Sequence, residues 1–248
     1  MPGMANTPRG MNAIIKSTLA EQAYGTLHRQ IVSGELACGR RLLAEELAVA
    51  LQISPTPIKE ALVRLEAEGL VATELRRGVT VRRFSATDVT ELYEARLFIE
   101  LHALRQGFAA GRVTPVFLSS LSALFARHVA AVRLGTLRGL REALRLDRLF
   151  HAEIVGLLQN KVFASWHRRV IDQTHTVRVY TLETYPCPRL AAEHGALLEA
   201  LEHGDQDIAL EALKRHLCLS RDEILQRPGF ANPPPVVVVR RPHRKRAP

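Results

Sequence analysis

Four residues in the second half of the chain combine types and spacing that suit a metal ion. Asp147 and His151 are four residues apart, so on a helix they project from one face and can share a ligand. His194 and His216 follow on two later apolar segments. Three imidazoles and one carboxylate suit a borderline divalent ion such as Zn, Ni, Mn or Fe, and they leave positions open for water or a small oxyanion. The spacing alone does not establish the site, because the chain has ten histidines and a single histidine is more often a surface or hydrogen-bonded residue.

A long helical region has to position these residues. From Thr87 to Gln226, apolar side chains recur at helical spacing. This pattern predicts about six helices and no convincing strand. Because no internal repeat of roughly 20–50 residues is present, the helices are expected to form a bundle rather than a solenoid. The breaks between them fall at Gly111–Pro115, Gly135, Gln159-Asn160, Pro186–Pro188 and Gly204.

A second set of residues, nearer the N-terminus, has the pattern of a helix whose tip enters a DNA groove. Ser54 is expected to cap this helix, two prolines fall in its first turn, where a missing N–H costs little, and Gly69 ends it. Thr56 and Lys59 then face outward, one helical turn apart. The inward face consists of Ile58, Ala61, Leu62 and Leu65.

The segments on either side complete a winged helix-turn-helix. Leu43–Leu51 forms a preceding short helix, and Gln52-Ile53 leaves only a tight turn before the next one. Leu70–Val81 alternates loosely and breaks at Arg76-Arg77-Gly78, which predicts two strands with a basic tip. An earlier helix, roughly Leu19–Ser33, covers the other two. The predicted fold class is therefore mainly α: a winged helix-turn-helix with a small β wing, followed by an all-α bundle.

The sequence of the predicted DNA-binding segment matches a known pattern through Leu47-Ala48 to Ser54, Thr56–Leu62, Arg64–Val71 and the Arg77-Gly78 wing. Over residues 20–82 it resembles the amino-terminal domain of the GntR family of bacterial transcription regulators. The resemblance implies binding to double-stranded DNA, with Ser54, Thr56 and Lys59 at base edges or nearby phosphates. The residues expected to position the domain on the backbone or in the minor groove are Arg40, Arg41, Arg77 and Gly78.

The match departs from the family at the start of the recognition helix. Pro55 follows the capping serine where the family usually has arginine, and Lys59 likewise stands where arginine is usual. Lysine cannot make the two parallel hydrogen bonds to guanine that arginine makes. We therefore expect a target preference that differs from the family's common operator, with groove entry preserved.

The helical region carries a second resemblance. The segment Glu91-Leu-Tyr-Glu-Ala-Arg-Leu-Phe-Ile-Glu100, the Asp147–His151 helix, Asn160 and the two later histidines resemble the FCD ligand-sensing domain of the FadR-type branch of the GntR family, in its shorter six-helix (VanR-like) version. In that family the aspartate and three histidines bind a metal ion, which holds a small carboxylate effector with nearby polar groups. The resemblance thus implies a divalent metal cofactor and an organic acid effector. The alternative is a buried polar network that needs no metal.

Other polar residues of the bundle carry weaker signals. Arg96 is a candidate anchor for an effector carboxylate, although an ion pair with Glu100 at i+4 fits the spacing equally well. Asn160 is expected to lie at a helix end rather than to bind metal. The histidines without a carboxylate or histidine partner at ligand spacing are interpreted as structural; they are His128, His167 and His175.

Composition agrees with a helical protein of the cytoplasm. A hydrophobic content of 47% with only 5% aromatic residues favours helices packed by Leu, Ala and Val. The cysteines Cys38, Cys187 and Cys218 are odd in number and lack metal-type spacing, so reduced thiols are expected. The first residues are polar, and the longest apolar run is far below the roughly 20 residues of a membrane span. The prediction is a cytoplasmic protein without a membrane partner.

The predicted boundaries give a disordered N-terminus at 1–12, a DNA-binding domain at 13–82, a linker at 83–88, an effector-binding and dimerisation bundle at 89–226, and a disordered basic tail at 227–248. The net charge of +9 is concentrated in that tail, which holds six Lys or Arg and no acidic residue. A basic tail adds only sequence-independent phosphate attraction, so a solvated extension is favoured over a specific role.

The favoured function is a metabolite-responsive transcription regulator. It is expected to be a homodimeric repressor on a palindromic operator, and to release DNA when a small organic acid binds at the metal site. Two other classes stay open: a DNA-binding protein without effector or metal, and, less favoured, a metal-dependent enzyme, since a metal with open positions also activates water. No catalytic residue is predicted, because the bundle offers no evident general base beside the metal ligands.

Overall fold

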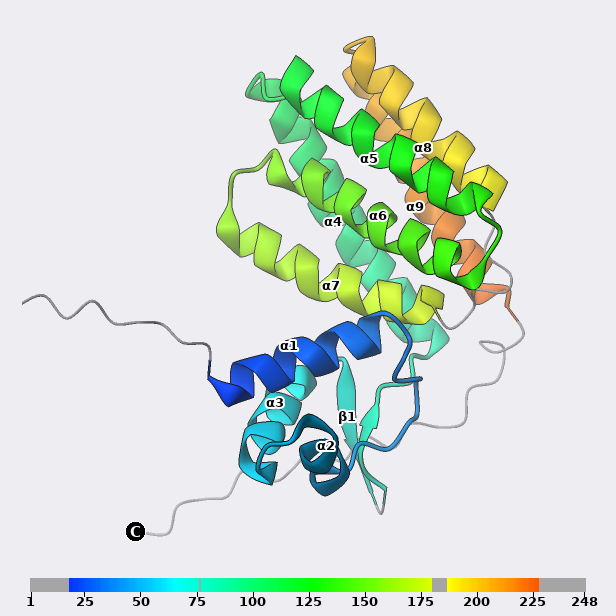
Figure 1. Cartoon of the computed structure of the whole chain (residues 1–248). Coiled ribbons are helices and arrows are strands. Elements are labelled where there is room, and N and C mark those ends of the chain that lie inside the picture. The colour runs from blue at the N-terminus through cyan, green and yellow to red at the C-terminus, as the bar shows by residue number, and fades with distance from the viewer. Residues whose placement is uncertain (1–17, 76, 180–186, 228–248) are drawn as a thin grey trace, which may run out of the picture.

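The computed structural model describes residues 18–75, 77–179 and 187–227. Within these ranges the chain forms nine helices and one two-stranded antiparallel sheet. An N-terminal domain and a helical bundle meet where α1 (Leu19–Val32) lies against α7 (Lys161–Val179), as Figure 1 shows. This confirms the predicted fold class. The predicted disordered segments 1–12 and 227–248 lie outside the described residues, apart from Arg227.

Three helices build the core of the N-terminal domain. Helix α1 begins with a capping box, in which Thr18 and Glu21 each accept a hydrogen bond from the other's backbone N–H. The helices α2 (Ala44–Leu51) and α3 (Pro55–Ala67) are joined at Gln52, whose φ of 55° reverses the chain within one tight turn. The shared core includes Leu27, Ile31, Ala48, Ile58, Ala61, Leu62 and Leu65. The inward face predicted for the recognition helix α3 is therefore confirmed.

The start of α3 differs in one detail from the prediction. Ser54 has the extended backbone of an N-cap residue, but its hydroxyl accepts no capping hydrogen bond. The usual donors to such a cap are the N–H groups of the second and third helical residues, and the third is Pro57, which has none. At the other end, Gly69 takes a φ of 74° and closes the helix as predicted.

The wing follows α3 directly. Strands β1 (Val71–Glu74) and β2 (Gly78–Val81) pair antiparallel, with Val71 opposite Val81 and Glu74 opposite Gly78. Gly78 has a φ of 77°, a backbone conformation that glycine adopts without strain. Arg41 adds a bridge to Thr80, so the segment before α2 extends the sheet edge. The hairpin extends away from the bundle (Figure 1).

Six helices make up the bundle, which matches the number predicted. Their bounds are α4 Ala86–Ala109, α5 Pro115–Arg133, α6 Leu137–Gly156, α7 Lys161–Val179, α8 Cys187–Glu202 and α9 Gln206–Leu225. Helix α4 packs against α6, α7 and α9, while α8 packs against α5 and α9. The described breaks fall where the sequence predicts them, and no strand lies between residues 86 and 227 outside the gap at 180–186.

Helix α4 begins inside the stretch predicted as a linker, residues 83–88. Ser85 is its N-cap: the hydroxyl accepts from the N–H of Asp88 at 3.1 Å, and the Ser85 N–H donates to the Asp88 carboxylate at 2.7 Å. Arg82 binds the same carboxylate at 2.5 Å. The connection between the domains is thus shorter than predicted, because this capping box fixes the helix start at Ala86.

Helix α5 departs from the expectation that no segment suits a membrane. Among the described residues it is the one helix long and apolar enough, by length and composition, to cross a bilayer. In the fold it packs along α6 and α8 and buries Leu121, His128 and Ala131. Only 17% of its apolar stretch is buried within the fold, so α5 lies at the outside of the bundle rather than in its centre.

Gln173 on α7 ties the two domains together. Its Nε2 donates to the backbone carbonyl of Glu68, the C-cap residue of α3, at 3.0 Å. Its Oε1 accepts from Arg82 at 3.3 Å. A Cβ at Gly69 would lie 2.9 Å from this side chain, so glycine permits the close approach. The end of the recognition helix is therefore held directly by the bundle.

Candidate metal centre and nucleic-acid interface

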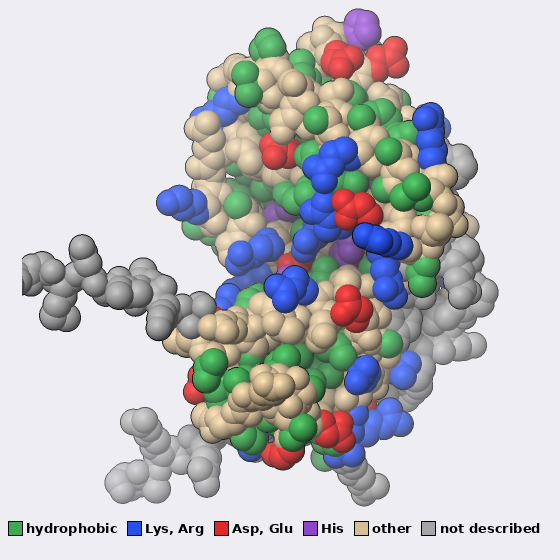
Figure 2. Space-filling view, in the orientation of Figure 1, with side chains coloured by type: hydrophobic (Ala, Val, Ile, Leu, Met, Phe, Trp, Pro, Cys, Tyr) green, Lys and Arg blue, Asp and Glu red, His purple; other side chains and the backbone are tan. Residues whose placement is uncertain are grey.

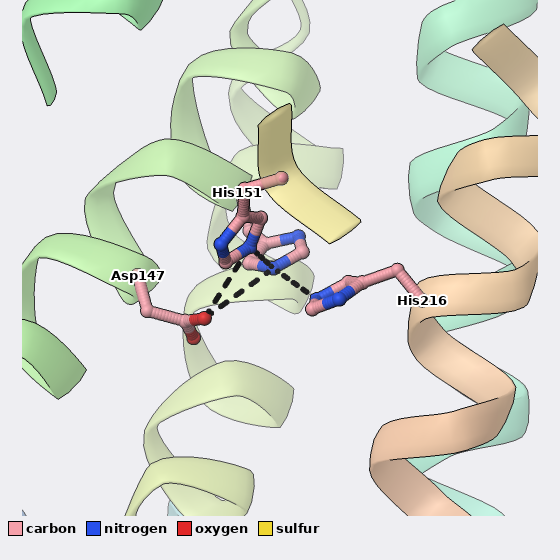
Figure 3. A group of neighbouring side chains, drawn as sticks. Asp147, His151 and His216 are labelled. Carbon is pink, nitrogen blue, oxygen red and sulfur yellow. Dashed lines mark hydrogen bonds and ion pairs between the residues drawn. The ribbon is translucent and has the colours of Figure 1, made fainter. Parts of the chain in front are cut away.

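The four predicted metal ligands meet at one point in the middle of the bundle. Asp147 and His151 project from one face of α6 toward His216 on α9 (Figure 3), and His194 reaches the same place from α8. The four side chains are at most 2% exposed. Their donor atoms lie within 4.8 Å of one another. The structure thus assembles a cluster from three helices, α6, α8 and α9.

The distances within the cluster suit a metal ion. Nε2 of His151 lies 3.2 Å from Nε2 of His216 and 3.5 Å from Nε2 of His194. Oδ1 of Asp147 lies 3.5 Å from Nε2 of His194 and 4.0 Å from Nε2 of His151. A metal ion bound at about 2.1 Å to each donor would place neighbouring donors roughly 3.0–3.4 Å apart. Small side-chain movements would therefore bring all four donors into coordination.

Carboxylates outside the cluster orient two of its rings. Nδ1 of His151 lies 2.6 Å from Oε2 of Glu100, and Nδ1 of His216 lies 2.9 Å from Oε2 of Glu193. A hydrogen bond from Nδ1–H to a carboxylate leaves Nε2 as the nitrogen with a free lone pair. Both Nε2 atoms face the cluster. The two rings are held in the tautomer and direction that a metal requires.

The protonation states of the cluster also suit a metal. Burial alone would raise the pKa of Asp147, but Arg178, at 2.5 Å, and the neighbouring histidines together hold the pKa well below its ordinary value. Burial, together with the neighbouring imidazoles, lowers the pKa of His194 and of His216 well below the ordinary histidine value. An ionised carboxylate and neutral imidazoles are the forms that bind a cation.

Several buried polar atoms near the cluster lack a hydrogen-bond partner among the described residues. They are the Tyr93 hydroxyl, Nη2 of Arg96, both ring nitrogens of His128, Oδ1 of Asp147 and the Ser220 hydroxyl. The charge of Asp147 acts on Tyr93, Arg96 and His128, which places these groups in one polar region. Ser220 lies one turn beyond His216 on α9. Buried polar groups without partners are costly, so such a region suits a ligand, an ion or ordered water that would pair them.

Arg96 combines the two roles that its spacing left open. It is 1% exposed, and its Nε donates to Oε1 of Glu100 at 2.8 Å, so the ion pair at i+4 is present. Its Nη2 makes no hydrogen bond, and its guanidinium lies 5.2 Å from the centre of the Tyr93 ring. One N–H group is thus available while the charge is balanced. Its role toward an effector stays a prediction.

The histidines interpreted as structural have different surroundings. Nε2 of His167 lies 3.1 Å from Glu100, which supports a structural role. The ring of His128 packs edge-on against His194, with ring centres 5.4 Å apart, so it borders the cluster. His175 is buried on α7, and burial lowers its pKa to about 3.

Sequence reasoning missed Glu193 and Arg178 as partners of the cluster. Glu193 directly precedes His194, which is the one signal that could have suggested it; nothing in the sequence singled out Arg178. Asn160 is a helix-end residue as expected. Its side chain accepts hydrogen bonds from the first N–H groups of α7, and the left-handed residue is Gln159.

The residues predicted to contact DNA are exposed on the N-terminal domain. Ser54, Thr56 and Lys59 are exposed at the start of α3. Nζ of Lys59 lies 3.6 Å from Glu45 on α2, and both side chains are more than half exposed, so the pair is weak and Lys59 can reorient. The remaining predicted residues lie around the wing and are exposed: Arg40, Arg41, Arg77 and Gly78.

Comparison with protein families decides the classification. Residues 19–81 match the model described as "Bacterial regulatory proteins, gntR family", and residues 91–218 match the FCD domain. The chain belongs to the GntR family. It is a DNA-binding transcription regulator with a GntR helix-turn-helix domain and an FCD domain, as the sequence resemblance predicted. The families it matches and their relatives are regulators rather than enzymes.

Relatives of this GntR regulator come from several bacteria. The Nta operon transcriptional regulator of Aminobacter aminovorans is 32% identical over 59% of this chain and 67% of its own length. The "Probable D-xylose utilization operon transcriptional repressor" of Paenarthrobacter nicotinovorans is 25% identical, over 82% of this chain and 88% of its own. A crystal structure of a GntR regulator from Rhodococcus sp. RHA1 is 25% identical and has a TM-score of 0.74, covering 83% of this chain and 97% of that one.

Proposed function

We propose that this GntR regulator is a homodimeric repressor of the bacterial cytoplasm that releases its operator when a small organic acid binds beside a metal ion in the bundle. The observation that carries the proposal is the buried cluster of Asp147, His151, His194 and His216, ringed by polar groups that lack partners. Such a site has no role in DNA contact, so it points to a second ligand.

The donor set supports a divalent cation such as Zn, Ni, Mn or Fe. Three imidazoles supply nitrogen donors, the carboxylate offsets one unit of the ion's charge, and four protein donors leave a position open in a five- or six-coordinate site. A bound ion would supply Lewis-acid attraction for a carboxylate oxygen of the effector. The orientation of the His151 and His216 rings favours a metal ion over a polar network without metal, because both rings present Nε2 to the same point.

The chain's own residues supply the other half of the effector site. The free Nη2 of Arg96 can donate to a carboxylate, and the Tyr93 hydroxyl and His128 ring can hydrogen-bond to further oxygen atoms. These groups are enclosed in the bundle, so the effector must be small. Hydroxy, keto or dicarboxylic acids fit this description better than long acyl chains.

The DNA contacts follow from the exposed surface of the N-terminal domain. Ser54, Thr56 and Lys59 would contact base edges or nearby phosphates in the major groove. The wing residues and their neighbours would hold the domain on the backbone or in the minor groove: Arg40, Arg41, Arg77 and Gly78. A homodimer formed through the bundle would present two recognition helices to palindromic half-sites about 34–36 Å apart.

Release of DNA requires that the effector binds one arrangement of the domains better than another. A tenfold change in operator occupancy needs a difference of about 1.4 kcal/mol between the two. The hydrogen bonds of Gln173 to Glu68 and Arg82 give the bundle a direct hold on α3, through which such a difference would act. The repressor role agrees with the name of the Paenarthrobacter relative.

A mobility-shift assay tests the proposal. Metal-loaded protein is mixed with DNA from upstream of its own gene, with and without a panel of small carboxylates. We expect one acid to release the DNA, and His216→Ala to keep DNA binding while losing the response. Lys214→Ala, an exposed change two residues away, is the matched control. An unchanged dose-response in His216→Ala would remove the metal site from the mechanism. Purified protein without bound metal and without response to any acid would favour a DNA-binding protein that has no effector.

A further inference from the structure

A cleft lies between the two domains, away from the metal cluster. It has a volume of about 620 Å³ and lies between α1 on one side and α6 and the end of α7 on the other. This volume is within the range of small-molecule sites. Figure 2 shows Lys and Arg side chains gathered along the junction of the two domains, with histidine visible in the recess.

The lining of this cleft is strongly basic. Its arginines are Arg29, Arg138, Arg141, Arg145 and Arg148, against the acidic residues Glu35 and Glu142. The four arginines of α6 follow one another at i, i+3, i+7 and i+10, so they form a stripe about 15 Å long on one helix face. Like charges at this spacing repel one another and destabilise an isolated helix. The stripe therefore calls for compensating negative charge.

The protein itself supplies part of that charge. Arg145 forms two hydrogen bonds of 2.7 Å with Glu142, and Arg148 binds Asp172 at 2.5 Å. Asp172 also lies 2.9 Å from Nε2 of His28, so the Arg148 end of the stripe is joined to α1. Arg145 and Arg148 are thus balanced by carboxylates of the chain.

The other three arginines of the lining are not balanced in this way. Within the described parts of the chain, Arg138 and Arg141 on α6 and Arg29 on α1 have no carboxylate partner. Nε of Arg141 is buried and makes no hydrogen bond with any described residue. A buried guanidinium N–H without an acceptor is costly and points to a missing anionic ligand. Two of these cations come from one wall of the cleft and one from the other.

We propose that the cleft binds a small polyanion, a molecule with at least two phosphate or carboxylate groups, between Arg138 and Arg141 on one wall and Arg29 on the other. Guanidinium groups pair with both kinds of anion through parallel hydrogen bonds. The site is separate from the metal cluster. Because its walls belong to different domains, a bound anion would fix their relative orientation and thereby act on operator binding.

A small anion fits the cleft better than duplex DNA does. The cleft is a recess between two domains, whereas DNA phosphates lie on a convex surface. The wing extends from the N-terminal domain away from the bundle (Figure 1), so the duplex is expected on the far side. A DNA role for these arginines is a rival outcome of the experiment below.

Calorimetric titration of the full-length protein with inorganic pyrophosphate, and separately with citrate, at constant ionic strength tests the proposal. We expect saturable binding of at least one of them, and the tighter one identifies the kind of anion. The double variant Arg138→Gln/Arg141→Gln should weaken it at least about tenfold, since two charge-assisted contacts are lost. The double variant Arg105→Gln/Lys214→Gln, at exposed positions outside the cleft, should bind like the wild type.

Both probes chelate metals, so the titration is repeated in His216→Ala. We expect the affinity to persist there, which separates this site from the effector site of the proposed function. Binding that disappears in His216→Ala, equal binding by the double arginine variant, or no saturable binding of either probe would each overturn the proposal. A loss of operator affinity in the double arginine variant without any anion present would also overturn the proposal, because the arginines would then bind the DNA duplex.

Discussion

Oε2 of Glu193 on α8 lies 2.9 Å from Nδ1 of His216 on α9, so one helix fixes the ring of a cluster histidine on its neighbour. The next residue of α8 is His194, itself a member of the cluster. A small shift of α8 therefore changes one ligand directly and another through its hydrogen bond. We therefore expect the metal affinity of the proposed site to depend on Glu193 in addition to the four ligands.

Replacing Glu193 tests this relationship. Glu193→Gln keeps the size of the side chain but removes the charge that holds Nδ1–H of His216. We expect the affinity for Zn²⁺ to fall by about 10–100-fold, measured by competition with a chelating dye. Glu199→Gln, an exposed change on the same helix, should leave the affinity unchanged. Equal affinities in the two variants would show that the ring of His216 is oriented by packing alone.

Removal of the metal should lower thermal stability. The ligands are buried and come from three helices, so a bound ion crosslinks the folded bundle, and at a hundredfold excess over its dissociation constant it adds about 2.7 kcal/mol. Treatment with a chelator should then lower Tm by roughly 5–10 °C. The same treatment should have no effect on His216→Ala. If the chelator leaves the wild-type Tm unchanged, the result would favour a cluster that functions as a polar network without metal.

His175 should make the stability of the bundle depend on pH. Burial, followed by the charges of Arg148 and Arg178, lowers its pKa from 6.5 to about 3. Below about pH 6.5, His175 therefore binds a proton in the unfolded chain but not in the folded chain. The free energy of unfolding falls as the pH drops from there toward 3. Between pH 7 and pH 5 this group alone should cost about 2 kcal/mol. Urea unfolding at the two values measures it.

The variant His175→Gln isolates this contribution, since glutamine does not titrate. Between pH 7 and pH 5, the free energy of unfolding should decrease by about 2 kcal/mol less in this variant than in the wild type. His102→Gln, a change at a partly exposed histidine, serves as the control. An identical pH response in the wild type and His175→Gln would mean that His175 accepts its proton within the fold.

Lys59 should contribute to operator binding without contributing to the fold. Its side chain is 64% exposed and forms only a 3.6 Å pair with Glu45. Lys59→Ala should weaken specific DNA binding by about 1–3 kcal/mol in a mobility shift, with an unchanged circular dichroism spectrum. Lys161→Ala, at an exposed position in the bundle, is the matched control. Full operator affinity in Lys59→Ala would show that another helix or loop reads the bases.

The sequence predicted local features well because short spacings determine them. The inward face of α3 follows from apolar residues at helical spacing, and Asp147 and His151 share a helix face because they are four residues apart. No spacing rule of this kind places His194 and His216 near Asp147 and His151. Their inclusion depended on the family resemblance, since only the tertiary fold brings these residues of α8 and α9 near His151 on α6.

Contacts between elements account for what the sequence did not predict. The stripe from Arg138 to Arg148 has a visible helical spacing, but only the fold shows that it faces α1 across a cleft. Arg178 reaches Asp147 because α7 lies beside α6. Ser54 has the right residue type for a cap but makes no capping bond, and the proline three residues later removes one of the two usual donors. Each of these outcomes depends on a neighbour that propensity does not describe.

The hydrogen bond from Gln173 to the Glu68 carbonyl fixes the C-terminal end of the recognition helix to the bundle, so the helix would pivot about that end. The helix has 13 residues and is therefore about 20 Å long, so a small tilt where α7 holds it becomes a larger sideways displacement at Ser54. In the proposed homodimer, the displacements of the two recognition helices would add. Half-sites spaced for one tilt would then fit poorly with the other, although neither helix loses a single contact of its own.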